Sequence, residues 1–234
     1  MHAQHREILK KIQKQERKGT SHSDNDSYIR SGHQYYDVSV PTRRAIAKDW
    51  LRANKNISKK EFLAVLDSLY KGDSHEEKTI ASQLLGYSRE IREGISLKKL
   101  ESWLDQLVGW AEIDSLCQNN FTADEMLGRW SEWETLIRKL AKSKNINKRR
   151  AALVLLTGPV QYSPDKRIAN LSFEILDALK HEKDILITKA VSWLLRSVVT
   201  NHKPEVSQYI EENKDTLPKV ALRETIRKIR TGKK

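Results

Sequence analysis

The sequence predicts an all-α protein made of many short helices, and three observations lead to this fold class. Glycine and proline together account for 14 of the 234 residues, whereas average proteins contain roughly twice that share. Apolar residues recur at spacings of three and four along most of the chain, which is the period of an amphipathic helix. The chain contains neither Asn-Gly nor Asp-Gly, the dipeptides most typical of β-hairpins.

The first expected helix lies close to the N-terminus. Ile8 and Ile12 indicate an amphipathic helix there, and the polar segment 19–27 indicates a loop after it. We therefore expect residues 1–27 to form a loosely attached helix and loop, and we assign this segment no chemistry.

Further helix signals continue along the chain. Pro41 is suited to open a helix, and Ser58 with Glu61 predicts a capping box before the next one. Apolar stripes occupy residues 45–51, 62–69, 80–85, 97–108, 136–140, 152–156, 171–179, 185–199, 206–210 and 220–229. Breaks are expected at Gly72–Asp73, Gly94, Asn145, Gly158–Pro164, His181, His202–Pro204 and Leu217–Pro218.

The expected helices form pairs that recur roughly every 35–40 residues, a period typical of degenerate HEAT-like repeats. We predict a single α-helical HEAT-like repeat domain, residues 1–234, in which the pairs stack into a solenoid with a concave basic face. An irregular helical bundle is the alternative that the pattern leaves open. The sequence alone also does not place the basic residues on one face.

The chain is strongly basic, with 43 Lys and Arg against 31 Asp and Glu and a net charge of +12. The excess is uneven: residues 61–120 carry a net −5, while 1–60, 121–180 and 181–234 carry +8, +4 and +5. Such a balance points to a polyanionic partner such as nucleic acid. Solvated Lys and Arg on ordinary helix surfaces are the other explanation for many of these charges.

The composition also indicates in which cellular compartment we expect the protein. Cys117 is the single cysteine, which excludes an internal disulfide and a cysteine-based zinc site. The longest apolar run, Ala151–Leu156, is far shorter than the ~20 residues that span a bilayer. The N-terminus lacks the apolar core of a secretory signal. We expect a monomeric cytoplasmic protein that does not bind membranes and lies at the nucleoid when bound to DNA.

Several familiar catalytic motifs are missing. The chain has no GxxxxGK[ST], GxGxxG or HExxH sequence and no nucleophile elbow. His2 and His5 are spaced to reach one metal ion, but no carboxylate supports them. We therefore expect neither a metal nor an organic cofactor.

One constellation of residues is suited to chemistry. Trp110 and Asp114 lie four residues apart, so on a helix they share a face, and this places a carboxylate beside an aromatic wall. The alternative is that Trp110 packs in the core and Asp114 caps the segment.

Three further groups provide candidate contacts to phosphate. Arg149 and Arg150 point about 100° apart on a helix, so one can face a cleft while the other faces solvent. Trp193 shares a helical face with Lys189 and Arg196, a combination of cations and an aromatic that suits phosphate contact and stacking. Trp193 as a plain core residue is the alternative. Arg43 and Arg44 are also candidates, because they follow Pro41 at an expected helix start.

These residues lead to a resemblance. From about Tyr28 to Ile229 the chain resembles the AlkD-like DNA alkylation repair family of alkylpurine DNA glycosylases. Five segments occur in the same order and at matching separations: Tyr28-Ile29-Arg30 with Pro41-Thr42-Arg43-Arg44, Trp110-x-x-x-Asp114-Ser115, Arg150-Ala151-Ala152, Lys189-Ala190-x-x-Trp193-x-Leu195-Arg196, and Arg223-Glu224-x-Ile226.

The resemblance implies a HEAT-like solenoid that cradles duplex DNA. It also implies hydrolysis of the N-glycosidic bond of cationic alkylpurines such as N3-methyladenine and N7-methylguanine, without a cofactor. By the same resemblance Asp114 is the catalytic carboxylate, and Trp110 and Trp193 are the aromatic walls. Tyr28 is a further aromatic of the cleft, and Arg150 binds a phosphate beside the lesion.

The chain departs from the family pattern at three positions. Gly109 and Asn147 stand where aromatic residues are expected, and Ser39 stands where a family example has a Gln that reaches the lesion. The expected cleft therefore contains fewer aromatic residues than the family pattern. Two other functions stay open on the sequence: a non-catalytic DNA-binding or architectural solenoid, and a protein–protein adaptor.

Overall fold

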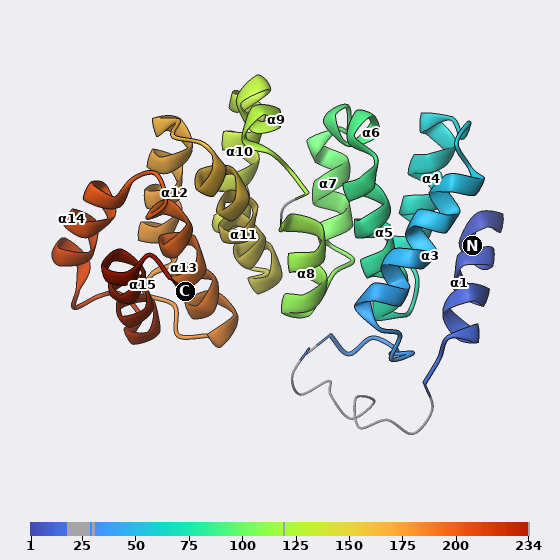
Figure 1. Cartoon of the computed structure of the whole chain (residues 1–234), viewed down its shortest axis with the longest axis horizontal. Coiled ribbons are helices and arrows are strands. Elements are labelled where there is room, and N and C mark those ends of the chain that lie inside the picture. The colour runs from blue at the N-terminus through green and yellow to red at the C-terminus, as the bar shows by residue number, and fades with distance from the viewer. Residues whose placement is uncertain (18–28, 30, 119, 234) are drawn as a thin grey trace. The chain divides into compact units, whose positions relative to one another are not determined.

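The computed structural model describes residues 1–17, 29, 31–118 and 120–233. These residues form fourteen helices and no β-strand, with an isolated parallel bridge between Gln34 and Ser74 (Figure 1). The all-α prediction is thus confirmed. Tyr28 lies outside the described residues, so its expected place in a cleft stays a prediction.

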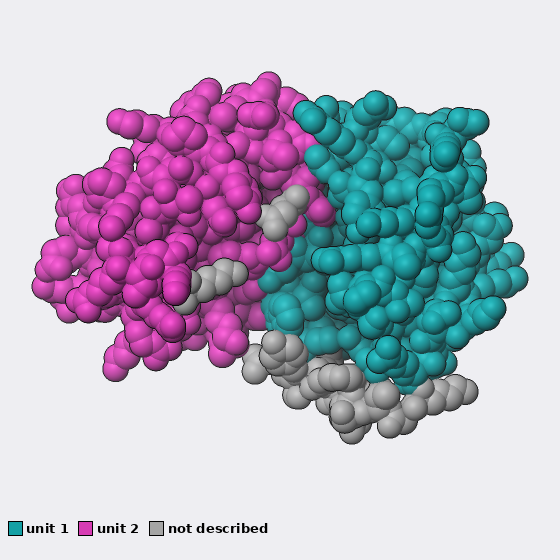
Figure 2. Space-filling view, in the orientation of Figure 1, with its two compact units in different colours: residues 1–116 teal, residues 117–234 magenta. Residues whose placement is uncertain are grey.

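The chain divides into two compact units, residues 1–116 and residues 117–234, which we call unit 1 and unit 2 (Figure 2). Unit 1 contains α1 (Ala3–Lys14), α3 (Val40–Ala53), α4 (Lys59–Tyr70), α5 (His75–Tyr87), α6 (Arg89–Glu93), α7 (Leu97–Leu104) and α8 (Gly109–Cys117), whose last residue opens unit 2. Unit 2 contains α9 (Ala123–Gly128), α10 (Trp130–Ala141), α11 (Ile146–Tyr162), α12 (Lys166–Leu179), α13 (Ile185–Val198), α14 (Lys203–Asn213) and α15 (Lys219–Thr231).

Helix α1 is firmly attached to unit 1, unlike the loose attachment expected from the sequence. It packs against α3, α4 and α5, and Ile8 and Ile12 are completely buried. The His5 Nε2 donates a hydrogen bond of 2.5 Å to the buried Glu77 carboxylate. The polar residues around Ile8 gave no sign of this buried pair, because a histidine near a terminus is usually solvated.

The first turn of α5 joins much of unit 1. Ser74 and Glu77 form a capping box there, which satisfies N–H groups that a helix start otherwise leaves unpaired. The buried Glu76 carboxylate accepts hydrogen bonds from the backbone N–H groups of Tyr36 (3.1 Å) and Val38 (3.2 Å). This turn therefore fixes the segment 31–39 against the helices of unit 1.

Unit 2 has the paired arrangement that helical repeats produce. Helices α11, α13 and α15 pack side by side in one row, and α10, α12 and α14 pack against them. The successive pairs are α10 with α11, α12 with α13, and α14 with α15 (Figure 1). Helices α11 and α13 carry all five candidate residues of unit 2: Arg149, Arg150, Lys189, Trp193 and Arg196.

The expected break at Gly158–Pro164 is wrong in its position. Helix α11 continues through Gly158 and Pro159 and ends at Tyr162. A proline inside a helix removes one backbone donor, and Pro159 is buried within α11. The Asn201 side chain donates to the carbonyls of Val160 and Gln161, which satisfies the end of the helix.

The described helices are short or carry many charges. None of them combines the length and apolar character needed to cross a membrane.

Candidate functional site

The first group of candidate residues lies on α8 in unit 1. Trp110 and Asp114 sit one turn apart on this helix, as their spacing predicted. Asp114 retains 9% of its exposure and Trp110 is half-buried. A carboxylate of this kind is partly shielded from water, where charge interactions are stronger than in bulk solvent. The pair can therefore act on positive charge that develops close to it.

The start of α8 explains one departure from the family pattern. Gly109 has a φ of 79°, a left-handed conformation that glycine adopts without the steric cost that a residue with a Cβ meets. An aromatic residue at this position would strain the turn. The loss of an aromatic here is therefore tied to the local backbone.

A second departure has an equally local reason. Ser39 is the N-cap of α3, and its hydroxyl oxygen accepts the backbone N–H of Thr42 at 3.3 Å. Serine is among the best N-cap residues. Ser39 therefore acts in the structure as the cap of the helix that Pro41 was expected to open.

The two arginines of α3 differ in their surroundings. Arg44 is exposed, as a phosphate contact requires, whereas Arg43 is buried and donates to the Thr79 hydroxyl at 2.5 Å. Burial lowers the pKa of the Arg43 guanidinium, and the nearby Glu76 carboxylate opposes this effect. The structure thus places Arg43 inside unit 1, because it meets Thr79 and Glu76 there, and not on the surface where we expected it.

A second group of candidate residues lies in unit 2, where α11 and α13 pack together. Arg150 retains 5% of its exposure and donates from Nη1 to the Leu186 carbonyl at the start of α13. Arg149 forms two bonds to the Glu182 carboxylate, at 2.6 and 3.0 Å, and one to the Ser143 carbonyl. Both arginines thus hold neighbouring segments, and neither points freely to solvent.

Helix α13 presents the other three candidate residues. Lys189 is exposed, while Trp193 and Arg196 are half-buried. Arg196 lies 3.4 Å from the Glu224 carboxylate of α15, and its Nε donates to the Ser192 carbonyl at 3.1 Å. Within unit 2 the structure therefore brings Lys189, Trp193 and Arg196 onto one helix next to Arg150.

Trp193 and Arg196 line a hollow of about 180 Å³ in unit 2. Helices α11, α13 and α15 contribute its walls, most of which are polar. Tyr162, at the end of α11, is 75% exposed beside it. Lys228 of α15 adds a second cation. Sequence reasoning missed Tyr162 and Lys228, since Tyr162 lies within the expected break and Lys228 within an ordinary basic stripe.

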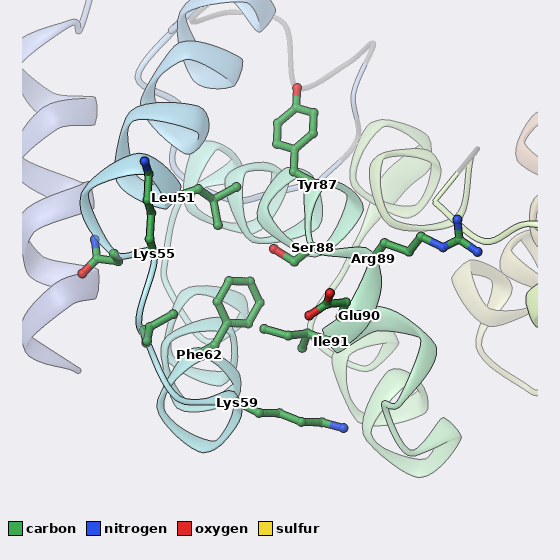
Figure 3. A pocket seen from close by; sticks show the side chains of 11 residues that line it. Leu51, Lys55, Lys59, Phe62, Tyr87, Ser88, Arg89, Glu90 and Ile91 are labelled. Atoms are coloured by element: carbon green, nitrogen blue, oxygen red, sulfur yellow. The ribbon is translucent and has the colours of Figure 1, made fainter.

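A larger hollow of about 700 Å³ lies elsewhere in unit 1, at the ends of α3 and α5. Figure 3 shows Leu51, Phe62 and Ile91 around it, while the side chain of Arg89 points away from Phe62 and Ile91. None of the candidate residues lines this hollow. It is therefore separate from the candidate site.

The described residues contain no group of three or more His, Cys, Asp or Glu side chains that could hold a metal ion. His5 is engaged with Glu77 and Ser68, so the spacing of His2 and His5 does not produce a common ligand set.

Comparison with known proteins identifies the family. A model described as DNA alkylation repair enzyme matches residues 6–229. No protein of curated function matches the chain. A solved structure titled predicted DNA alkylation repair enzyme from Enterococcus faecalis is similar, with a TM-score of 0.72, 18% identity, and coverage of 90% of this chain and 95% of that one.

A second solved structure, smu.31 from Streptococcus mutans UA159, has a TM-score of 0.57 and 19% identity, covering 81% of this chain and 92% of that one. At these levels of sequence identity, the similarity to both structures supports the fold alone. The family match extends over nearly the whole chain and includes every segment on which the resemblance was based. The chain therefore belongs to the DNA alkylation repair enzyme family.

Proposed function

We propose that this protein is a DNA glycosylase that releases cationic alkylated purines, such as N3-methyladenine and N7-methylguanine, from duplex DNA. Membership of the family supports a role in the repair of alkylated DNA and implies DNA as the partner. The observation that carries the finer proposal is the pairing of Trp110 with the largely buried Asp114 on one face of α8.

The chemistry of the substrate explains why one carboxylate suffices. A purine alkylated at N3 or N7 already carries a positive charge, so it leaves as a neutral base without a general acid. The enzyme must still do two things: stabilise an oxocarbenium-like sugar and position a water molecule for attack. Asp114 can meet the first through its negative charge and the second through a hydrogen bond.

The tryptophans add selectivity for cationic bases. An indole face attracts a cation by about 0.5–2 kcal/mol, an attraction that a neutral base does not share. We assign this role to Trp110 and Trp193. The same faces can stabilise positive charge as it moves from the base to the sugar.

In this proposal the basic residues of unit 2 bind the DNA phosphates. Lys189 and Arg196 lie on one helix with Trp193, and phosphate contacts from such residues fix the position of a protein on the duplex. Arg150 sits on the neighbouring helix, where it also holds the start of α13. In unit 1, the exposed Arg44 at the start of α3 is a further candidate for phosphate contact.

Release of free base from methylated duplex DNA is the direct test. Wild-type protein should release N3-methyladenine or N7-methylguanine, and Asp114→Asn should lose most of this activity. Asp124→Asn is a matched control, because it removes the same charge from an exposed position on α9. Equal release by wild type and Asp114→Asn would refute the role of Asp114.

A non-catalytic DNA-binding protein is the second candidate function. The positions of Gly109 and Asn147 favour it, because both lack the aromatic side chain expected there and thin the candidate cleft. It predicts salt-dependent binding of duplex DNA with no base release from any alkylated substrate. The same assay therefore separates the two functions.

A further inference from the structure

A largely buried polar cluster lies on the side of α8 opposite Trp110 and Asp114. We define it by His33, His75 and Glu112. Residues two positions away on a helix lie about 200° round the axis, so Glu112 faces away from both Trp110 and Asp114. One side of α8 therefore carries the candidate chemistry, while the other is held by this cluster.

Glu112 is completely buried and accepts hydrogen bonds from three directions. The His33 Nδ1 donates to its two oxygens at 2.9 and 3.1 Å. The His75 Nδ1 donates at 3.2 Å, and the backbone N–H of Val108 donates at 3.0 Å. A buried carboxylate is costly unless it is paired in this way, so each bond restrains the orientation of α8.

The electrostatics agree with this geometry. Burial acts to raise the pKa of Glu112, but the hydrogen bonds from His33, His75 and Val108 outweigh it and hold the pKa below its ordinary value. Lys78, which is also buried, adds an attractive charge. The carboxylate is therefore ionised at neutral pH and remains a strong acceptor.

The partners of Glu112 come from two other segments of unit 1. His75 opens α5, and its ring lies 5.1 Å from that of Tyr35. His33 belongs to segment 31–39, which Glu76 also fixes to α5. The cluster thus joins α8 to α5 and to the segment that leads into α3.

We propose that Glu112, held by His33 and His75, is a positioning residue that sets the orientation of the Trp110–Asp114 face. This inference rests on the proposed function, because it concerns the residues that hold the groups proposed for base release in place. A reacting group displaced by about 1 Å can lose as much as roughly 100-fold in rate. A satisfied and buried anchor behind α8 is a direct way to prevent such a displacement.

Glu112→Gln and Glu77→Gln form a matched pair of variants. Both remove the charge of a buried glutamate that accepts a histidine N–H, but the hydrogen bonds of Glu77 go to His5 of α1 and to Ser74, whereas those of Glu112 hold α8. Both should lower Tm. At temperatures well below Tm, only Glu112→Gln should slow base release with protein in excess, by about 10- to 100-fold, with the Kd for undamaged DNA unchanged.

His33 provides a milder test, because its side chain is 23% exposed. His33→Ala should slow base release without affecting DNA binding. His33→Asn should recover part of the rate, since the asparagine amide nitrogen lies close to the position of the imidazole Nδ1. No difference between His33→Ala and wild type would overturn the inference.

Fluorine NMR of protein labelled with 5-fluorotryptophan tests positioning without relying on activity. The Trp110 resonance is assigned by its loss in Trp110→Phe. It should shift or broaden in Glu112→Gln and stay in place in Glu77→Gln. If it moves as expected while wild type releases no base, the proposed function fails and the anchor stands. If it is unchanged in Glu112→Gln, or moves equally in both variants, the inference is wrong.

Discussion

The two units treat acidic residues in opposite ways. Within the described residues, unit 1 buries four carboxylates, Glu76, Glu77, Glu112 and Asp114, whereas unit 2 buries none. Unit 1 has 20 basic and 17 acidic residues, a net +3, while unit 2 has 23 and 14, a net +9. Unit 1 therefore concentrates negative charge internally, and unit 2 carries most of the excess positive charge.

This difference separates two tasks that a DNA repair enzyme must perform. Three of the buried carboxylates of unit 1, those of Glu76, Glu77 and Glu112, accept hydrogen bonds that hold its segments together. The fourth, Asp114, is the candidate for the reaction. The candidate phosphate contacts of unit 2, Arg150, Lys189 and Arg196, lie on α11 and α13. The proposal thus places chemistry mainly in unit 1 and affinity mainly in unit 2.

The substitution with the largest expected effect tests whether chemistry and DNA affinity lie in different units. Asp114→Asn should reduce the rate of base release by about 100-fold or more, the usual cost of removing a main electrostatic contact to a transition state. The Kd for undamaged duplex should stay the same or fall, because a charge that repels phosphate is lost. Single-turnover base release and fluorescence anisotropy give the two values. A large increase in Kd would contradict the assignment of affinity to unit 2.

Acid should affect unit 1 before unit 2. Burial acts to raise the pKa of Glu77 and of Glu112, but hydrogen bonds, chiefly from histidines, hold both below the ordinary value of about 4.3. Their pairing therefore stabilises the fold above that pH, and the stabilisation is lost as the pH falls through the lowered values. Hydrogen exchange near pH 4 should show protection lost in α1, α5 and α8 sooner than in α11 and α13. Simultaneous loss in all five helices would argue against this difference.

Arg150 tests whether one residue serves both structure and binding. Its bond to the Leu186 carbonyl joins α11 to α13, so Arg150→Met should lower the free energy of unfolding by about 1–3 kcal/mol. The resemblance adds that DNA binding and excision should weaken together. Arg150→Lys keeps the charge and should retain more affinity than Arg150→Met. Equal affinities in these two variants, measured below their Tm, would leave Arg150 with a structural role alone.

Trp193→Ala should have a smaller and more selective effect. Loss of a cation–π contact of about 0.5–2 kcal/mol corresponds to a 2- to 30-fold slower release of cationic bases. Affinity for undamaged duplex should change little, because undamaged bases are neutral. If the rate of base release and the affinity for undamaged duplex fell together, Trp193 would instead support the packing of α13. A circular dichroism melt of the variant distinguishes these causes.

Periodicity was enough to predict the helices but not their polar connections. The stripe from Phe62 to Leu69 and the cap at Ser58 predicted α4 correctly, because both signals are local. Pro159 misled the prediction, since packing and the Asn201 bonds maintain α11 beyond it. Local signals do not report such long-range partners.

The candidate site shows the same limit. The spacing of Trp110 and Asp114 placed them on one face of a helix, as a property of that helix alone. The partners of Arg43 and Glu112 lie 36 and 79 residues away in the chain at Thr79 and His33. An arginine after a proline therefore looked accessible, and a glutamate between two candidate residues attracted no notice. Both assignments depend on which segments meet in three dimensions.

The smallest expected effect concerns a single exposed lysine. Each phosphate contact contributes about 0.9 to the slope of log affinity against log salt concentration. If Lys189 contacts phosphate, Lys189→Gln should reduce the magnitude of that slope by about this amount and weaken binding only a few-fold. Lys166→Gln removes the same charge from an exposed position at the start of α12, on the other row of helices, and should leave the slope unchanged. Equal slopes in the two variants would mean that the charge of unit 2 acts diffusely. A difference confined to Lys189 would localise the DNA to the row of α11, α13 and α15.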